Sequence, residues 1–123
     1  MPQDDFVRGG ASAVVRTVAG GLATQIDYSY DHADGPQSGM LLLQVAQDRA
    51  SAVFLDTFHQ FPAWLMLIGT AHANGLEVKA NYAPGFEWII AVTWASADSW
   101  RLLMSNAMAE VGSYLAVEMD FRR

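Results

Sequence analysis

The chain has no cysteine, which excludes disulfide bonds, thiol catalysis and thiolate metal sites. Positive charge is scarce as well, since 7 Lys and Arg stand against 13 Asp and Glu and give a formal net charge of -6. No cluster of basic residues interleaved with aromatic residues offsets this acidity. We therefore expect no binding to nucleic acid and no attraction to anionic membranes.

Long hydrophobic runs and familiar catalytic motifs are also missing. No run approaches the roughly 20 residues of a membrane-spanning helix, and the acidic N-terminus lacks the basic start of a signal peptide. A cytoplasmic protein is the expectation. The sequence contains no phosphate-binding loop and no Gly-x-Ser-x-Gly nucleophile elbow. Its three histidines lack the spacing of metal ligands, so we expect no metal site and no cofactor.

Apolar and aromatic residues are abundant instead. Hydrophobic residues make up 52% of the 123 residues and charged residues only 16%, with four Trp, six Phe and four Tyr. A chain of this length forms one domain and buries roughly two-thirds of its surface without needing metals or disulfides. We expect residues 1–123 to form that domain, with 1–10 as a flexible or short helical lead-in.

Turn signals recur along the chain at regular spacing. Segments of about seven to ten residues separate them, which is typical of an all-β sandwich or barrel and predicts about nine strands. The strongest signal, Asn74-Gly75, predicts a type I′ hairpin turn, because both residues accept a positive φ. The signals are Gly20-Gly21, Asp34-Gly35-Pro36, Asp48-Arg49, Asn74-Gly75, Pro84-Gly85, Asp98-Ser99 and the region of Gly112.

Alternation of apolar and polar residues supports strands in 26–30, 76–82, 86–94 and 117–121. The segment 99–112 is ambiguous. Several of its apolar residues recur at helical spacing, with Ser99 as a candidate N-cap. We favour a strand, which would direct Trp100, Leu102 and Met104 inward and Arg101 outward.

Two segments are apolar on both faces, residues 40–45 (Met-Leu-Leu-Leu-Gln-Val) and 64–68 (Trp-Leu-Met-Leu-Ile). A strand with one face in water should alternate, so both segments require cover on the second face. A helix or long loop would supply that cover within the chain. A partner subunit would supply it from outside.

The order of segments resembles an uncharacterised bacterial family with a calycin-type, lipocalin-like barrel. The residues that carry the resemblance extend from about Ala11 to the C-terminus. They are Gly20-Gly21, Tyr28-Ser29-Tyr30, Ser38-Gly39-Met40, Ala52-Val53-Phe54-Leu55-Asp56-Thr57 and Phe121-Arg122-Arg123. The resemblance implies an antiparallel, roughly closed barrel whose interior can hold a small apolar ligand.

One departure from that family bears on assembly. Its members open with an extra segment that forms the first strand, whereas only a short acidic stretch precedes Ala11. We therefore expect an all-β, antiparallel lipocalin-like (calycin) barrel or a partly open half-barrel. An open barrel has an unpaired edge, and together with the doubly apolar segments this edge predicts a homodimer.

The alternation also predicts which side chains face inward and could contact a ligand. Asp56 is the notable polar member, because on a strand it shares a face with Phe54 and Phe58, where a carboxylate needs a partner. Hydrogen bonds to backbone amides or to Arg101 would satisfy it. The predicted ligand-binding residues are Tyr28, Phe54, Asp56, Phe58, His72, Tyr82, Trp88, Ile90, Trp94 and Met104.

Three functions fit these features. The first is binding of a small, largely apolar molecule inside the barrel, with no catalytic residue assigned. The second is an enzyme that uses the same cavity, with Asp56 as general base and His72 or Tyr82 assisting. The third is a homo-oligomeric interaction module with a barrel completely filled by side chains.

Overall fold

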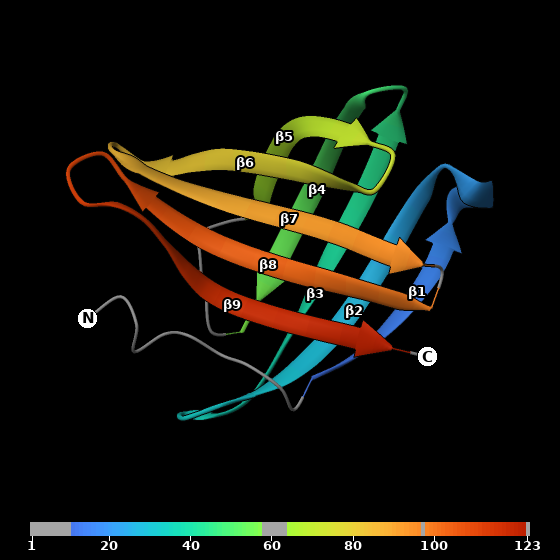
Figure 1. Ribbon diagram of the computed structural model, residues 1–123, viewed down its shortest axis with the longest axis horizontal. Helices are drawn as coiled ribbons and strands as arrows, with labels where there is room; N and C mark the ends of the chain where they lie inside the picture. The colour runs from blue at the N-terminus through green and yellow to red at the C-terminus, as the bar shows by residue number, and fades with distance from the viewer. Residues whose placement is uncertain (1–10, 58–63, 97, 123) are drawn as a thin grey trace.

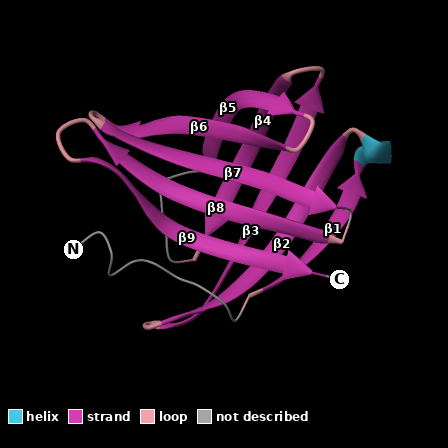
Figure 2. Cartoon of the chain, viewed as in Figure 1, coloured by secondary structure: helices cyan, strands magenta, loops and turns pink. Residues whose placement is uncertain are grey.

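The computed structural model describes residues 11–57, 64–96 and 98–122. These residues form nine strands and one short 3₁₀ turn (Figures 1 and 2). The predicted lead-in at 1–10 lies outside the described residues. In chain order the elements are β1 (Ser12–Val18), η2 (Ala19–Gly21), β2 (Ala23–His32), β3 (Gly35–Ala46), β4 (Arg49–Asp56), β5 (Leu65–His72), β6 (Gly75–Ala83), β7 (Phe86–Ser96), β8 (Ser99–Met108) and β9 (Gly112–Arg122).

All nine strands belong to one antiparallel sheet, in which each strand pairs with its neighbours in the sequence. The sheet coils into a nearly closed barrel, so that β2, β3 and β4 pass behind β6 to β9 (Figure 1). Within the described ranges, β1 and β9 are not paired with each other. The prediction of an all-β antiparallel barrel is confirmed, and the architecture is consistent with the calycin type.

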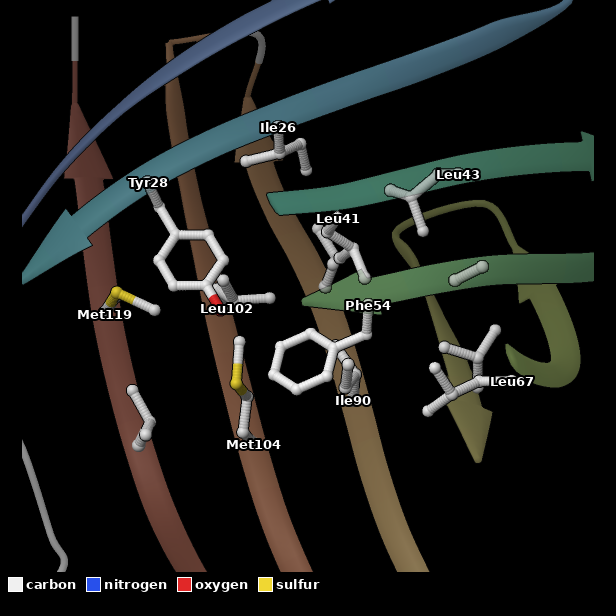
Figure 3. Close-up of a cluster of buried hydrophobic side chains, with 14 of the residues drawn as sticks. Ile26, Tyr28, Leu41, Leu43, Phe54, Leu67, Ile90, Leu102, Met104 and Met119 are labelled. Atoms are coloured by element: carbon white, nitrogen blue, oxygen red, sulfur yellow. The ribbon is translucent and has the colours of Figure 1, made fainter. Parts of the chain in front are cut away.

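Inward-facing side chains fill the middle of the barrel. Leu41, Phe54, Ile90, Leu102 and Met104 come from four different strands and are completely buried (Figure 3). Burying an aliphatic or aromatic side chain of this size contributes about 1.5–3 kcal/mol each. The alternating pattern of the sequence therefore identifies most of the core correctly.

Segment 99–112 contains a strand, as favoured from the sequence. In β8, Leu102 and Met104 face the core, and Arg101 points outward. The Arg101 guanidinium binds Asp120 at 2.5 Å and lies 3.6 Å from Glu118, both on β9. Alternating burial and cross-strand ion pairs are typical of a strand with one face in the core and the other in solvent.

The sharpest turn prediction is wrong in its details. The hairpin between β5 and β6 is closed by the pair His72 and Gly75, so Ala73 and Asn74 form the turn. Neither Asn74 nor Gly75 has the positive φ of the predicted type I′ turn. Gly75 instead allows close packing, because a Cβ atom there would lie 2.5 Å from the backbone oxygen of Val92.

The two doubly apolar segments lie in β3 and at β5. Their inner residues are core residues, including Leu41 and Leu67. Of their outer residues, Met40 and Leu42 on β3 are half-buried, whereas Met66 and Ile68 on β5 each retain 73% of their accessible surface. None of the helical structure in the described part of the chain is long and apolar enough to cross a membrane. The helical structure of the described residues is the three-residue η2, so no helix in that part of the chain supplies the cover predicted for these outer faces.

Candidate functional site: a pocket at the open end of the barrel

A pocket of about 780 Å³ opens at the barrel end where η2 and the β7–β8 turn lie. Its deep part is formed by Ile26, Leu43, Leu76 and Val92, which are buried core residues on β2, β3, β6 and β7. Pockets that hold small organic molecules measure about 300–1,000 Å³ and have mostly apolar walls. This pocket falls within that size range, and its walls combine apolar surface with nearly as much polar surface.

An aromatic row forms one wall of the pocket. Trp94, Trp100 and Phe121 are register partners across β7, β8 and β9, and all three line the pocket. The rings of Trp100 and Phe121 stack, with centroids 4.2 Å apart and planes inclined by 23°. The Trp94 indole N–H donates a hydrogen bond to the backbone oxygen of Ala73 at 3.1 Å. These contacts hold flat apolar surfaces in place before any ligand arrives.

Polar groups lie mainly around the rim. Thr24 and Ser96 contribute hydroxyl groups, and Asp120 and Arg122 lie beside the pocket at the end of β9. Asp120 is already hydrogen-bonded to Arg101. The pocket can therefore hold an apolar body at depth and a polar end near solvent.

The opposite side of the pocket belongs to β1. Ala13 and Val15 face the pocket, whereas the intervening Val14 faces outward. Val15 remains 48% exposed, because β1 and β9 do not pair in the part of the chain that the structure describes. The open seam thus leaves one wall of the pocket accessible from the side.

Ten residues were predicted to contact a ligand, and of the nine that the structure describes, only Trp94 lines this pocket. Phe54, Trp88, Ile90 and Met104 are buried in the packed middle and far end of the barrel. The rings of Phe54 and Trp88 pack together with centroids 6.0 Å apart. Their inward direction was predicted correctly, but they fill the barrel below the pocket.

Three other predicted residues lie elsewhere or are not described. His72 is exposed at the end of β5. Tyr82 is half-buried, lies in a β-bulge opposite β7, and donates a hydrogen bond to Asn106 Oδ1 at 2.7 Å. Phe58 lies outside the described residues. Neither His72 nor Tyr82 lies next to Asp56 in the sheet register.

Asp56 forms a buried polar cluster with Tyr28 and Tyr30, called here the Tyr–Asp cluster. The Tyr28 hydroxyl donates to Asp56 Oδ2 at 2.5 Å, and the Tyr30 hydroxyl donates to Oδ1 at 3.0 Å. Hydrogen bonds to an ionised acceptor are stronger than neutral ones. Partners predicted from the sequence were backbone amides or Arg101, but Arg101 is engaged with Asp120 on the outer surface.

Gly39 makes this cluster possible. Tyr28 on β2, Gly39 on β3 and Asp56 on β4 form one cross-strand row. A Cβ atom on Gly39 would lie 2.3 Å from the Tyr28 hydroxyl oxygen and 2.6 Å from the backbone oxygen of Leu55. Because Gly39 has no side chain, the Tyr28 ring can lie across β3 and reach the carboxylate on the strand beyond.

The environment of the cluster keeps both phenols protonated. Burial raises the pKa of Tyr28 well above its ordinary value, and the negative charge of Asp56 raises that pKa further. The same two causes raise the pKa of Tyr30. A protonated phenol can donate to a carboxylate, so the pKa shifts and the hydrogen bonds support each other. The carboxylate is thus occupied by two donors and is suited to a structural role.

A metal site finds no support in the geometry that is described. Across residues 11–57, 64–96 and 98–122, no three His, Asp or Glu side chains come close enough together to hold a metal ion. Comparison of the chain with protein-family models, curated proteins and solved structures gives no match. The pocket must therefore be interpreted from its own chemistry.

The sequence contained a partial signal for this pocket. Trp100 was predicted to face inward, and a hairpin near Asp98 brings it opposite Trp94. Phe121 belongs to an alternating segment, 117–121. The pairing of Trp94 with Trp100 could be proposed from the hairpin near Asp98. The empty volume in front of the rings could not be predicted from the sequence, because it depends on how far apart the strands lie at that end.

Proposed function

We propose that this protein binds a small, largely apolar molecule in the pocket at the open end of its barrel. The observation that carries the proposal is the 780 Å³ pocket with a buried aliphatic base and the aromatic row as a wall. Transfer of apolar surface from water to such walls contributes about 25 cal/mol per Å². The resemblance to a calycin-type, lipocalin-like family supports the same function.

The pocket also suggests how a ligand would be oriented. Leu43 and Val92 line its buried part, whereas Ser96 and Arg122 lie at exposed positions. An elongated molecule would place its apolar end between the strands and its polar end toward Ser96 and Arg122. The ligand class is therefore an amphipathic molecule with a dominant apolar part.

The test uses a fluorescent fatty-acid analogue and two matched variants on β1. Val15 lines the pocket, while its neighbour Val14 is exposed on the outer face. We expect Val15→Glu to weaken uptake of the probe about tenfold or more, because a carboxylate in an apolar site must lose part of its hydration. Val14→Glu changes the net charge equally and should leave uptake nearly unchanged.

Intrinsic fluorescence supplies a second measurement. Trp94 and Trp100 line the pocket, so bound probe should quench part of the tryptophan emission. Saturable quenching that Val15→Glu weakens would support the proposal. Absence of uptake by the wild-type protein, or equal affinities for the two variants, would contradict it.

A further inference from the structure

The outer face of β3 to β5 carries a continuous apolar surface, called here the β3–β5 patch. Leu42, Val53 and Met66 form one cross-strand row through its centre. The strand partners Met40 and Leu55 extend it toward one end. The patch consists of Met40, Leu42, Val53, Leu55, Trp64, Met66 and Ile68.

The β3–β5 patch is unusual in its exposure. Trp64 is 63% exposed, Met66 and Ile68 are each 73% exposed, and Leu55 is 40% exposed. No member of the patch is charged. For side chains of this size these fractions correspond to roughly 500 Å² of apolar surface, at the upper end of what a monomer usually presents.

We propose that the β3–β5 patch is the interface of a homodimer, in which a second copy packs its own patch against the first. The area supports this occupant. Two such faces would bury roughly 1,000 Å² in total, near the lower limit for a specific protein interface. The complex is therefore a weak, concentration-dependent dimer.

Geometry also favours a second copy. Two β-sheet faces can pack about 10 Å apart with their side chains interdigitated. In a two-fold dimer the same patch serves both subunits, and the central strand β4, with Val53 at the middle of its row, lies opposite its symmetry mate. Each chain carries a formal net charge of -6, so two copies repel each other and the apolar contact must outweigh that repulsion.

This charge gives the dimer a distinctive salt dependence. Added salt screens the repulsion between two acidic chains, while the apolar contact persists. We expect the dimer to strengthen as the sodium chloride concentration rises. An interface held by ion pairs would weaken instead.

The test compares Met66→Glu with Val111→Glu by sedimentation velocity from low to high micromolar protein. Met66 and Val111 are exposed to similar extents, 73% and 70%, but Val111 lies in the β8–β9 turn, away from the patch. The wild-type protein and Val111→Glu should shift toward twice the 13.4 kDa monomer mass as concentration rises. Met66→Glu should remain a monomer, with an unchanged circular dichroism spectrum showing that it is folded.

Three outcomes would overturn the proposal. The wild-type protein could remain monomeric at every concentration and salt level. A dimer that persists in Met66→Glu would use another surface, such as the β1 edge. Binding of the monomer to neutral phosphatidylcholine vesicles, lost in Met66→Glu, would assign the patch to a membrane surface. Uptake of the fatty-acid analogue is a separate readout, because Met66 does not line the pocket.

Discussion

The Tyr28 ring passes closely over Gly39 in the barrel interior, and Gly39→Ala tests this contact with a single methyl group. The added carbon would lie 2.3 Å from the Tyr28 hydroxyl oxygen, so the ring must move away from Asp56. Loss of a hydrogen bond to a charged group costs about 1.5–3 kcal/mol. Crowding in a packed interior costs about 1–3 kcal/mol more.

One effect opposes this loss. Replacing a glycine within a strand lowers the entropy of the unfolded chain and stabilises the fold by about 0.5–1 kcal/mol. The net expectation for Gly39→Ala is a decrease of about 3 kcal/mol in the free energy of unfolding, or a fall of roughly 10 °C in Tm. Urea unfolding followed by tryptophan fluorescence and circular dichroism measures it. Ser38→Ala, at the exposed neighbouring position, should change stability by less than about 0.5 kcal/mol.

A double-mutant cycle identifies the cause. Tyr28→Phe alone removes the hydroxyl that binds Asp56 and should cost about 1.5–3 kcal/mol. In a chain that already carries Gly39→Ala, the same change should cost much less, because the bond is already broken. Additive losses, or a Gly39→Ala protein as stable as the wild type, would refute the reasoning.

Two further predictions concern the pH dependence of stability and the close approach of β6 to β5 at Gly69. Because the pKa values of Tyr28 and Tyr30 are raised in the folded state, their contribution is complete below the unfolded value near 10 and is lost as pH rises above it. Urea unfolding between about pH 9 and 11 should show the free energy of unfolding decreasing by up to about 2.7 kcal/mol per pH unit because of these two groups. A Tyr28→Phe/Tyr30→Phe protein whose stability falls with the same slope would contradict this. Gly69→Ala should cost more than Gly39→Ala, because its methyl group would meet the backbone oxygen of Glu77 at 1.8 Å; a stable, wild-type-like Gly69→Ala protein would show that β5 can move.

The strands could be predicted because an antiparallel barrel imposes a period of two on its sequence. In β6, for example, Leu76 and Val78 face the core and Glu77 and Lys79 face solvent. The strand β8 was harder to predict, because apolar residues such as Leu103 and Ala107 also recur at the spacing of a helix. Pairing with both β7 and β9 decides the conformation, and local propensity does not determine such non-local pairing.

The Tyr–Asp cluster was only partly predictable. Alternation placed Tyr28 and Asp56 on the inner face, and the need for a partner followed from the charge of Asp56. The partner itself depends on the register of three strands, which aligns Tyr28, Gly39 and Asp56 in one row. Gly39 was a sign of this arrangement, because a glycine inside a strand often marks a close approach of other groups.

The pocket was the least predictable feature. The sequence pattern shows which side chains face the barrel interior, but whether they leave an empty volume depends on how they pack. Tyr28, Phe54 and Trp88 were predicted to line a cavity, yet all three are buried, and the rings of Phe54 and Trp88 pack against each other below the pocket. At the base of the pocket the inward residues are Ile26, Leu43, Leu76 and Val92, which are shorter and leave room, while the rings of Trp94, Trp100 and Phe121 lie along one wall. Side chains in the filled part of the barrel therefore stabilise the fold, and those at the open end are available to a ligand. Variants at the Tyr–Asp cluster should change stability without contacting a ligand, and Val15→Glu should change ligand affinity without disturbing that cluster.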